Sequence, residues 1–185
     1  DKATNNVTEV VYTPIKSDPT RVAALLSGDV DMLTDLPTQD VARLRGEAGL
    51  VRAYDLILDA RFEILEAQLR AACGPAPAEA CHVLAATALW WRIQIDPDSR
   101  ALDEEFSTAV EQAIRTTAAW TVRAPEDAEA WFYLGGAYAA RVQWLVLREE
   151  RLAAARDGKR IKDALERALA LDPGLDDAYF GIGLY

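Results

Sequence analysis

The residue types that most often bind metals or act as nucleophiles gather around one turn of this chain. Cys73 and Cys81 flank the stretch G-P-A-P-A-E-A, and His82, the one histidine, follows directly. A zinc site needs four ligands, and only these three lie together, so we exclude zinc. The cysteines can form a disulfide or remain buried thiols at a corner between two helices, and we favour the thiols. Without a second histidine or an acidic partner no catalytic triad can be drawn, so we expect a structural His82 and no enzymatic activity.

Two other patterns resemble ligand-binding motifs but lack essential parts. Asp29, Asp31 and Asp35 are spaced like the start of a calcium loop, yet the glycine at the sixth position and the closing glutamate are missing. The pair Gly135-Gly136 has no strand before it, as a phosphate-binding loop would require. We therefore predict neither a metal nor a cofactor.

Aromatic and basic side chains could instead form a surface for a partner. Trp90 and Trp91 are adjacent and cannot face the same way, so one of them can be exposed on a binding surface. Basic residues also recur between positions 141 and 162. Ion pairs on helix surfaces account for them, and the alternative is a clamp for an acidic peptide or a terminal carboxylate. The candidate partner-binding residues are Trp90, Trp91, Arg141, Arg148 and Arg151.

The net negative charge of the chain argues against some classes of binding partner. The formal net charge is −10, which repels nucleic acid and anionic membrane surfaces. No apolar run is long enough to span a bilayer. We therefore predict a protein or peptide partner, no nucleic acid and no membrane insertion. Because both ends read like sequence from within a domain, we interpret the chain as a piece of a longer protein and leave its compartment open.

The elements that would position these residues fall into two groups, and the first group is short and mixed. Residues 7–12 and 30–36 have the β-prone pattern of strands. A helix is predicted over 20–27, where Gly28 stops it, and another from Pro37 to about Arg45, ending at Gly46. Residues 1–50 are thus predicted to form a small βαβα segment with parallel strands.

From about residue 53 the pattern is helical, with apolar residues at helical spacing. D-P-D-S at 96–99 and Asp157-Gly158 predict breaks between helices. The predicted helices cover about 56–73, 78–95, 101–122, 126–156 and 159–171, with a sixth after Pro173. The fold class is therefore mainly α.

The prolines of this region mark a repeat. Pro77, Pro125 and Pro173 are evenly spaced along the chain, and the last two open the related stretches P-x-x-x-x-A-W-F-x-L-G and P-x-x-x-x-A-Y-F-x-I-G. Repeats with a period of this size indicate stacked helical hairpins. The predicted units are 77–124, 125–172 and a truncated 173–185, and we expect the last helical end to self-associate or fray.

The repeat resembles the tetratricopeptide family. Trp131-x-x-Leu134-Gly135-x-x-Tyr138 has the W-x-x-L-G-x-x-Y pattern of that family, and Ala164-x-x-x-Ala168 before Leu171-Asp172-Pro173 is similar to its second helix. The resemblance implies an α-solenoid of antiparallel hairpins over 53–185, which acts as a non-catalytic scaffold with a peptide groove. The units here are longer than the usual one of that family, and we expect the extra length at 142–156 to extend the first helix. The predicted repeat-packing residues are Trp131, Leu134, Gly135, Tyr138, Ala164, Ala168, Pro173, Tyr179, Phe180 and Gly183.

The resemblance also suggests why two glycines stand inside a helix, where each costs about 1 kcal/mol relative to alanine. Glycine at position 135 would let a neighbouring helix come close, and the gain in packing would exceed that cost. Gly136 is only tolerated at its position. Gly135→Leu should therefore destabilise the fold by about 1–3 kcal/mol, whereas Gly136→Ala should be neutral or stabilising.

Residues 7–50 resemble a different family, the extracytoplasmic solute-binding proteins of peptide ABC importers. The core of the resemblance is T-R-V-A-A-L-L-S-G-D-V-D at 20–31. It implies a second interpretation, in which the chain contains a fragment of an oligopeptide-binding importer component and the parent protein is periplasmic or otherwise extracytoplasmic. If the resemblance does not reflect the parent protein, we expect a cytoplasmic protein instead. The segment lacks most of the two lobes that enclose a peptide, and the joint to the helical repeats would lie at 46–52.

Overall fold

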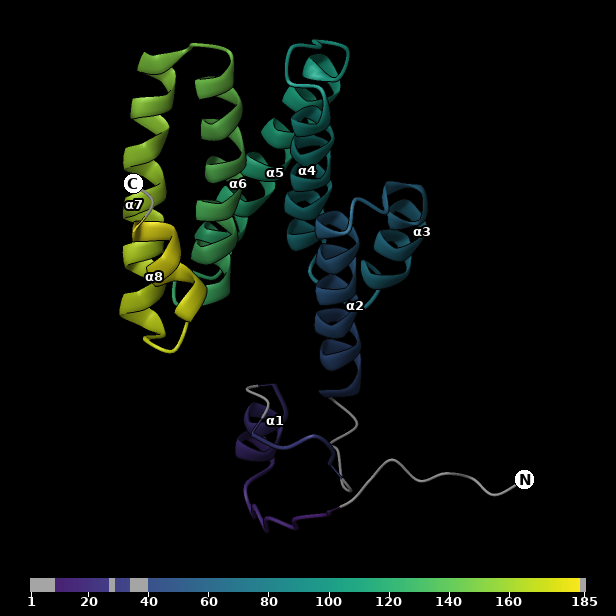
Figure 1. The fold of residues 1–185 in the computed structure, drawn as a ribbon. Helices are drawn as coiled ribbons and strands as arrows, with labels where there is room; N and C mark the ends of the chain where they lie inside the picture. Colours follow the sequence, from purple (N-terminus) through teal and green to yellow (C-terminus); the bar gives the residue numbers. More distant parts are fainter. Residues whose placement is uncertain (1–8, 27–28, 34–39, 184–185) are drawn as a thin grey trace, which may run out of the picture. The chain divides into compact units, whose positions relative to one another are not determined.

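The computed structural model describes residues 9–26, 29–33 and 40–183, and every regular element in these ranges is a helix (Figure 1). The mainly α-helical class is therefore confirmed for the described residues. The chain divides into two units, residues 1–42 and 43–185, and each is described by itself. No helix in the described ranges combines the length and the apolar character needed to cross a bilayer.

The first unit has one described helix, α1 (Asp18–Leu26), close to the helix predicted there. The predicted strands are wrong wherever the structure describes them, because residues 9–12 and 30–33 are not in strands. The remaining strand residues, 7–8 and 34–36, lie outside the described residues. Val10, Val11 and Tyr12 are all exposed, so the alternating pattern has no buried face. An extended segment without a partner or a buried face is not stable as a strand.

The second unit begins within α2 (Asp40–Leu58), which runs through Gly46 and Gly49 without a break. The prediction that a helix ends at Gly46 is wrong, and the predicted joint at 46–52 lies inside this helix. A Cβ atom at Gly46 would lie 2.8 Å from the backbone of Ala76, and one at Gly49 would lie 2.7 Å from Cβ of Ala72. Gly49 therefore allows close packing against the end of the next helix, and Gly46 allows it against the turn that follows that helix.

That next helix, α3 (Phe62–Ala72), is separate from α2, so the prediction of one helix over 56–73 is wrong. The backbone reverses at Ala60, which has a φ of 55°. The Arg61 N–H donates to the Leu56 carbonyl at 2.8 Å, and the Ala60 N–H donates to the Ile57 carbonyl at 3.0 Å. This pair of bonds is a Schellman motif, with alanine at the left-handed position that glycine usually occupies.

Two helices then form the first hairpin, α4 (Ala78–Ile95) and α5 (Asp103–Arg123). The structure confirms the predicted bounds of α4, and those of α5 are within two residues of the prediction. The two helices pack against each other and against α6 (Ala128–Leu147). Phe106 and Val110 of α5 are fully buried in the core between these three helices.

The second hairpin pairs α6 with α7 (Arg151–Leu171), and Figure 1 shows the two helices side by side in antiparallel directions. One continuous helix over 126–156 was predicted here, and that prediction is wrong. The predicted break at Asp157-Gly158 is also wrong, since α7 passes through both residues. The expectation that residues 142–156 extend the first helix is wrong as well, because they are divided between the end of α6, the turn and the start of α7.

The true break between α6 and α7 is a second Schellman motif. Glu149 has a φ of 64°, and its N–H donates to the Val146 carbonyl at 3.1 Å. The Glu150 N–H donates to the Leu145 carbonyl at 2.8 Å. The left-handed residue is again not glycine, so the sequence carries no conventional signal for this turn.

The helix bounds repeat at the interval set by the prolines. Helices α5 and α7 begin and end at equivalent positions of their units, and α8 (Asp176–Gly183) begins at the position equivalent to the start of α6. Pro77, Pro125 and Pro173 stand shortly before the starts of α4, α6 and α8. From α4 onward each helix packs on the next, and α4 also packs on α6. The two hairpins are therefore neighbours in space.

Leu165 of α7 connects three helices in the core of the second hairpin. It is buried, and its Cδ2 atom lies 2.7 Å from where a Cβ at Gly135 of α6 would be. Its Cδ1 atom lies 2.6 Å from where a Cβ at Gly181 of α8 would be. Gly136, in contrast, has only Val83 Cγ1 near it, at 3.7 Å. The close helix approach is therefore at Gly135 and not at Gly136.

Candidate functional site

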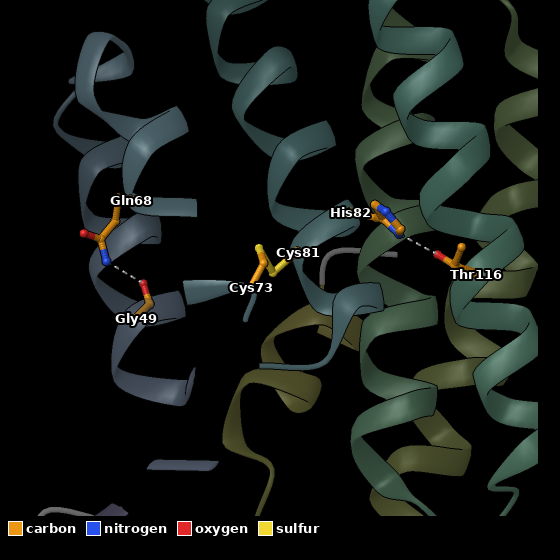
Figure 2. Close-up of a disulfide and its surroundings, with 6 residues drawn as sticks. All are labelled: Gly49, Gln68, Cys73, Cys81, His82 and Thr116. Carbon is orange, nitrogen blue, oxygen red and sulfur yellow. Dashed lines mark hydrogen bonds between the residues drawn. A yellow bond between two sulfur atoms is a disulfide. The ribbon is translucent and has the colours of Figure 1, made fainter. Parts of the chain in front are cut away.

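Cys73 and Cys81 form a disulfide, so the preference for two buried thiols is wrong (Figure 2). The bond joins the C-terminal end of α3 to the first turns of α4, and the described residues contain no free cysteine. His82 lies with Nδ1 3.2 Å from Oγ1 of Thr116 on α5, which links two helices. Within the described ranges, no group of three or more His, Cys, Asp and Glu side chains is arranged to hold a metal.

The predicted repeat-packing residues of the second hairpin lie in or beside its core. Four of them are buried: Leu134, Gly135, Ala164 and Ala168. Trp131 is partly buried and its Nε1 donates to the Pro125 carbonyl at 2.9 Å, which ties the start of α6 to the preceding turn. Tyr138 is also partly buried and packs against the cores on both sides of α6.

The corresponding residues at the C-terminal end of the repeat have a different environment. Tyr179 and Phe180 of α8 are 53% and 71% exposed, and Pro173 and Gly183 are exposed as well. Phe132, which occupies the position of the preceding unit that is equivalent to Phe180, packs against the core formed with α7 and α8. The same sequence register therefore gives a packed aromatic in α6 and an exposed one in α8.

The adjacent tryptophans of α4 face different surroundings. Trp90 is buried, and its Nε1 donates to Oε1 of Gln143 on α6 at 3.0 Å. Trp91 is 40% exposed. Trp91 is thus the one of the pair whose ring can meet a partner.

Arg148 is engaged within the chain. Its Nε and Nη2 atoms donate to the two carboxylate oxygens of Asp103 at 2.9 and 2.7 Å, and it also binds the Pro97 and Ser99 carbonyls. The indole of Trp144 donates to the same carboxylate at 3.1 Å. The hydrogen bond from Arg148 holds the pKa of Asp103 below its usual range. Arg148 therefore fastens the loop between α4 and α5 to the end of α6, with few donors left for a partner.

Arg141 belongs to a charged cluster around Asp157, a buried side chain in the middle of α7. Arg141 Nε donates to Oδ2 of Asp157 at 2.7 Å, and Arg160 Nη1 donates to Oδ1 at 2.8 Å. Arg141 also pairs with Glu111 of α5. Burial lowers the pKa of Arg141, but its two acidic partners more than offset that effect and raise the pKa overall. The guanidinium groups of Arg141 and Arg160 both lie over the ring of Tyr138, at 5.3 and 5.4 Å.

Arg151 is the remaining basic candidate. It is the first residue of α7 and is exposed. None of the acidic side chains in the described residues forms an ion pair with it. Lys159 and Lys162, also on α7, instead pair with Asp163 and Glu166, as expected for charges on a helix surface.

A pocket of about 290 Å³ lies between α5, α6 and α7, next to the charged cluster. Its apolar wall includes Val110, Trp144 and Leu145. Its polar wall combines three arginines with two acidic residues and one hydroxyl: Arg141, Arg156, Arg160, Glu111, Asp157 and Ser107. Such a site can bind a small molecule with a negative charge.

Comparison with known proteins adds no relative, since no protein-family model, curated protein or solved structure matches the chain. Any proposal on function therefore depends on the residues themselves.

The three acidic residues with calcium-loop spacing do not form a described site. Asp29 and Asp31 are exposed, and Asp35 lies outside the described residues.

Asp157 is the charged residue at the centre of this pocket, and the sequence did not indicate it as part of a site, whereas Arg156 and Arg160 belong to the basic stretch at 141–162. The D-G pair at 157–158 predicted a helix break, so a buried acidic side chain within a helix was not expected at Asp157. The local signal that could have indicated it is its spacing from Arg160, at i and i+3 on one helix, which allows an ion pair.

Proposed function

We propose that residues 53–185 act as a non-catalytic scaffold of the tetratricopeptide type, which binds a peptide or protein partner in a helical groove. The observation that supports this proposal is the regular recurrence of paired helices, with α5 and α7 in the same register. Stacked helix pairs of this kind create extended surfaces that can bind a partner.

Two of the predicted partner-binding residues suit this role. Trp91 offers a large exposed ring on α4, and Arg151 offers a charge with no ion-pair partner among the described residues. Tryptophan and arginine are the side chains that most often dominate binding energies at interfaces. We therefore expect them to contact the partner, whereas Trp90 and Arg148 support the fold.

The importer interpretation receives no further support from the described part of residues 1–42, which contains a helix but no strand. We therefore keep the scaffold as the proposed function. The disulfide points to an oxidising compartment, because such bonds rarely persist in the cytosol, and we propose an extracytoplasmic location. Labelling of free thiols in unfolded protein from the native cells would test the location, since two reactive cysteines would contradict it.

A selection from a random peptide library displayed on phage would test the scaffold function. We expect peptides that bind the whole chain, and we expect Trp91→Ala and Arg151→Gln each to weaken the best of them by about tenfold. Val122→Ala is the matched control, because Val122 is an exposed apolar residue on α5 that we do not assign to the groove. A selection that yields no saturable binder, or binders unaffected by both variants, would refute the proposal.

A further inference from the structure

The pocket between α5, α6 and α7 is lined by more positive than negative side chains, although the chain as a whole is acidic. Arg141, Arg156 and Arg160 line it together with Glu111 and Asp157, which leaves one positive charge in excess. The whole chain has a net charge of −10, so a local excess of positive charge runs against its composition. Charge of this sign in a concave site favours an anionic ligand.

The acids of the pocket are already occupied, whereas two of its arginines keep free donors. Both oxygens of Asp157 accept hydrogen bonds from arginine, and Glu111 accepts one from Arg141. Arg156 donates through Nε to the Leu152 carbonyl, and its terminal nitrogens have no partner among the described residues. Arg160 likewise uses only Nη1 in a hydrogen bond to a described residue. Planar guanidinium groups with free N–H donors are suited to bind a carboxylate or phosphate.

The apolar wall of the pocket is more deeply buried than the free arginines. Val110 and Leu145 are 1% and 6% exposed, and Trp144 is partly buried, whereas Arg156 and Arg160 are exposed. The ligand would thus place an apolar body inward and its charge toward the exposed arginines. A volume of about 290 Å³ is just below the range typical of ligand pockets, about 300–1,000 Å³, so the ligand must be small.

We propose that this pocket binds a small organic monoanion, namely a carboxylate attached to a short apolar body. A carboxylate carries the single negative charge that matches the excess of the pocket, whereas a phosphate ester carries about 1.5–2 charges at neutral pH. The carboxylate is bound by Arg156 and Arg160, and the apolar body packs on Trp144. This site is independent of the proposed peptide groove, so either can fail without the other.

A titration of the whole chain with benzoate, followed by two-dimensional NMR and by the shift in melting temperature, tests the proposal. Benzyl alcohol, which is neutral and of similar shape, and inorganic phosphate, which lacks an apolar body, are the comparison probes. We expect saturable benzoate binding with a dissociation constant of about 1 mM and shifts at the Trp144 indole, with at least about fivefold weaker binding of both other probes.

Two variants separate the pocket from general surface binding. Arg156→Gln should weaken benzoate binding by about tenfold, because it removes donors that no ion pair within the described residues requires. Arg92→Gln removes an exposed arginine of α4 that does not line the pocket and should leave the affinity unchanged. Ala153→Leu, which fills the pocket, should abolish binding without removing a charge. The proposal is overturned if benzyl alcohol or phosphate binds as well as benzoate, if no probe saturates, or if neither Arg156→Gln nor Ala153→Leu reduces binding.

Discussion

The close contact between Gly135 and Leu165 predicts how alanine substitutions in α6 change the stability of the protein. Gly135→Ala and Gly136→Ala are the same chemical change at adjacent positions of α6, and both gain about 1 kcal/mol of helix propensity. At Gly136 the added methyl group would lie 3.7 Å from Val83, an ordinary contact, so this variant should be more stable by about 0.5–1 kcal/mol. At Gly135 it would lie 2.7 Å from Cδ2 and 3.0 Å from Cγ of Leu165.

Leu165 has little room to move away, because its other methyl group fills the notch at Gly181. Overpacking of a core costs about 1–3 kcal/mol. Since the propensity gain is common to both variants, their difference in free energy of unfolding measures this packing cost directly. Gly135→Ala should therefore be less stable than Gly136→Ala by about 1–3 kcal/mol in urea unfolding followed by circular dichroism.

Leu165→Ala provides the internal control. This truncation alone should cost about 2–5 kcal/mol, because it leaves a cavity in the core. In its presence Gly135→Ala should no longer be penalised and should stabilise the protein as Gly136→Ala does. Equal stability of the two single alanine variants, or no coupling between positions 135 and 165, would refute the packing explanation.

Three further perturbations test other contacts. Reduction of the disulfide between Cys73 and Cys81, which are eight residues apart, should destabilise the fold by about 2–3 kcal/mol in urea, and an unchanged midpoint would contradict its structural role. Asp103→Asn should cost about 1–3 kcal/mol at neutral pH. Arg148 lowers the pKa of Asp103 in the folded state, so the stabilisation by Asp103 is fully present above its unfolded-state pKa of about 3.9. This stabilisation is lost as the pH falls through the folded-state pKa. The free energies of unfolding of the variant and the wild type should therefore become equal in acid. Burial raises the pKa of Tyr133 to about 12, so stability should fall as pH rises above about 10, and Tyr133→Phe should remove that part of the loss.

Helix positions were predictable where the sequence contains both an apolar period and a conventional stop signal. The bounds of α4 follow from Pro77 before it and D-P-D-S after it. The same signals place the start of α5 within two residues. The starts of α4, α6 and α8 were predictable from the prolines, because each proline lies in the turn before one of these helices.

The two breaks between helices that were not predicted, at Ala60 and at Glu149, share one physical cause. Both are Schellman motifs in which Ala60 or Glu149 takes the left-handed conformation. The usual signal for this motif is glycine, because a side chain costs energy there. At the second turn, tertiary contacts hold the chain in place, since Arg148 binds Asp103 and two carbonyls of an earlier loop. Contacts between positions far apart along the chain leave no local pattern in a sequence.

Glycine and aspartate within helices led to the opposite error, in which a helix break was predicted where the helix continues. Gly46 and the pair Asp157-Gly158 were interpreted as breaks, but all three lie inside helices. Gly46 is required by the nearby backbone of Ala76, and Asp157 is held by two arginines. These residues have tertiary roles that override their local preferences, and the candidate pocket could not be predicted because it depends on the same contacts.

The most direct test of the stacked-hairpin scaffold is a set of nuclear Overhauser contacts from the methyl groups of Leu165, measured on methyl-labelled whole chain. If the hairpins pack as described, one methyl group contacts the Hα protons of Gly135 and the other contacts those of Gly181. A Leu165 side chain that shows contacts to neither glycine would mean that α6, α7 and α8 are not stacked, and the scaffold proposal would lose its structural basis.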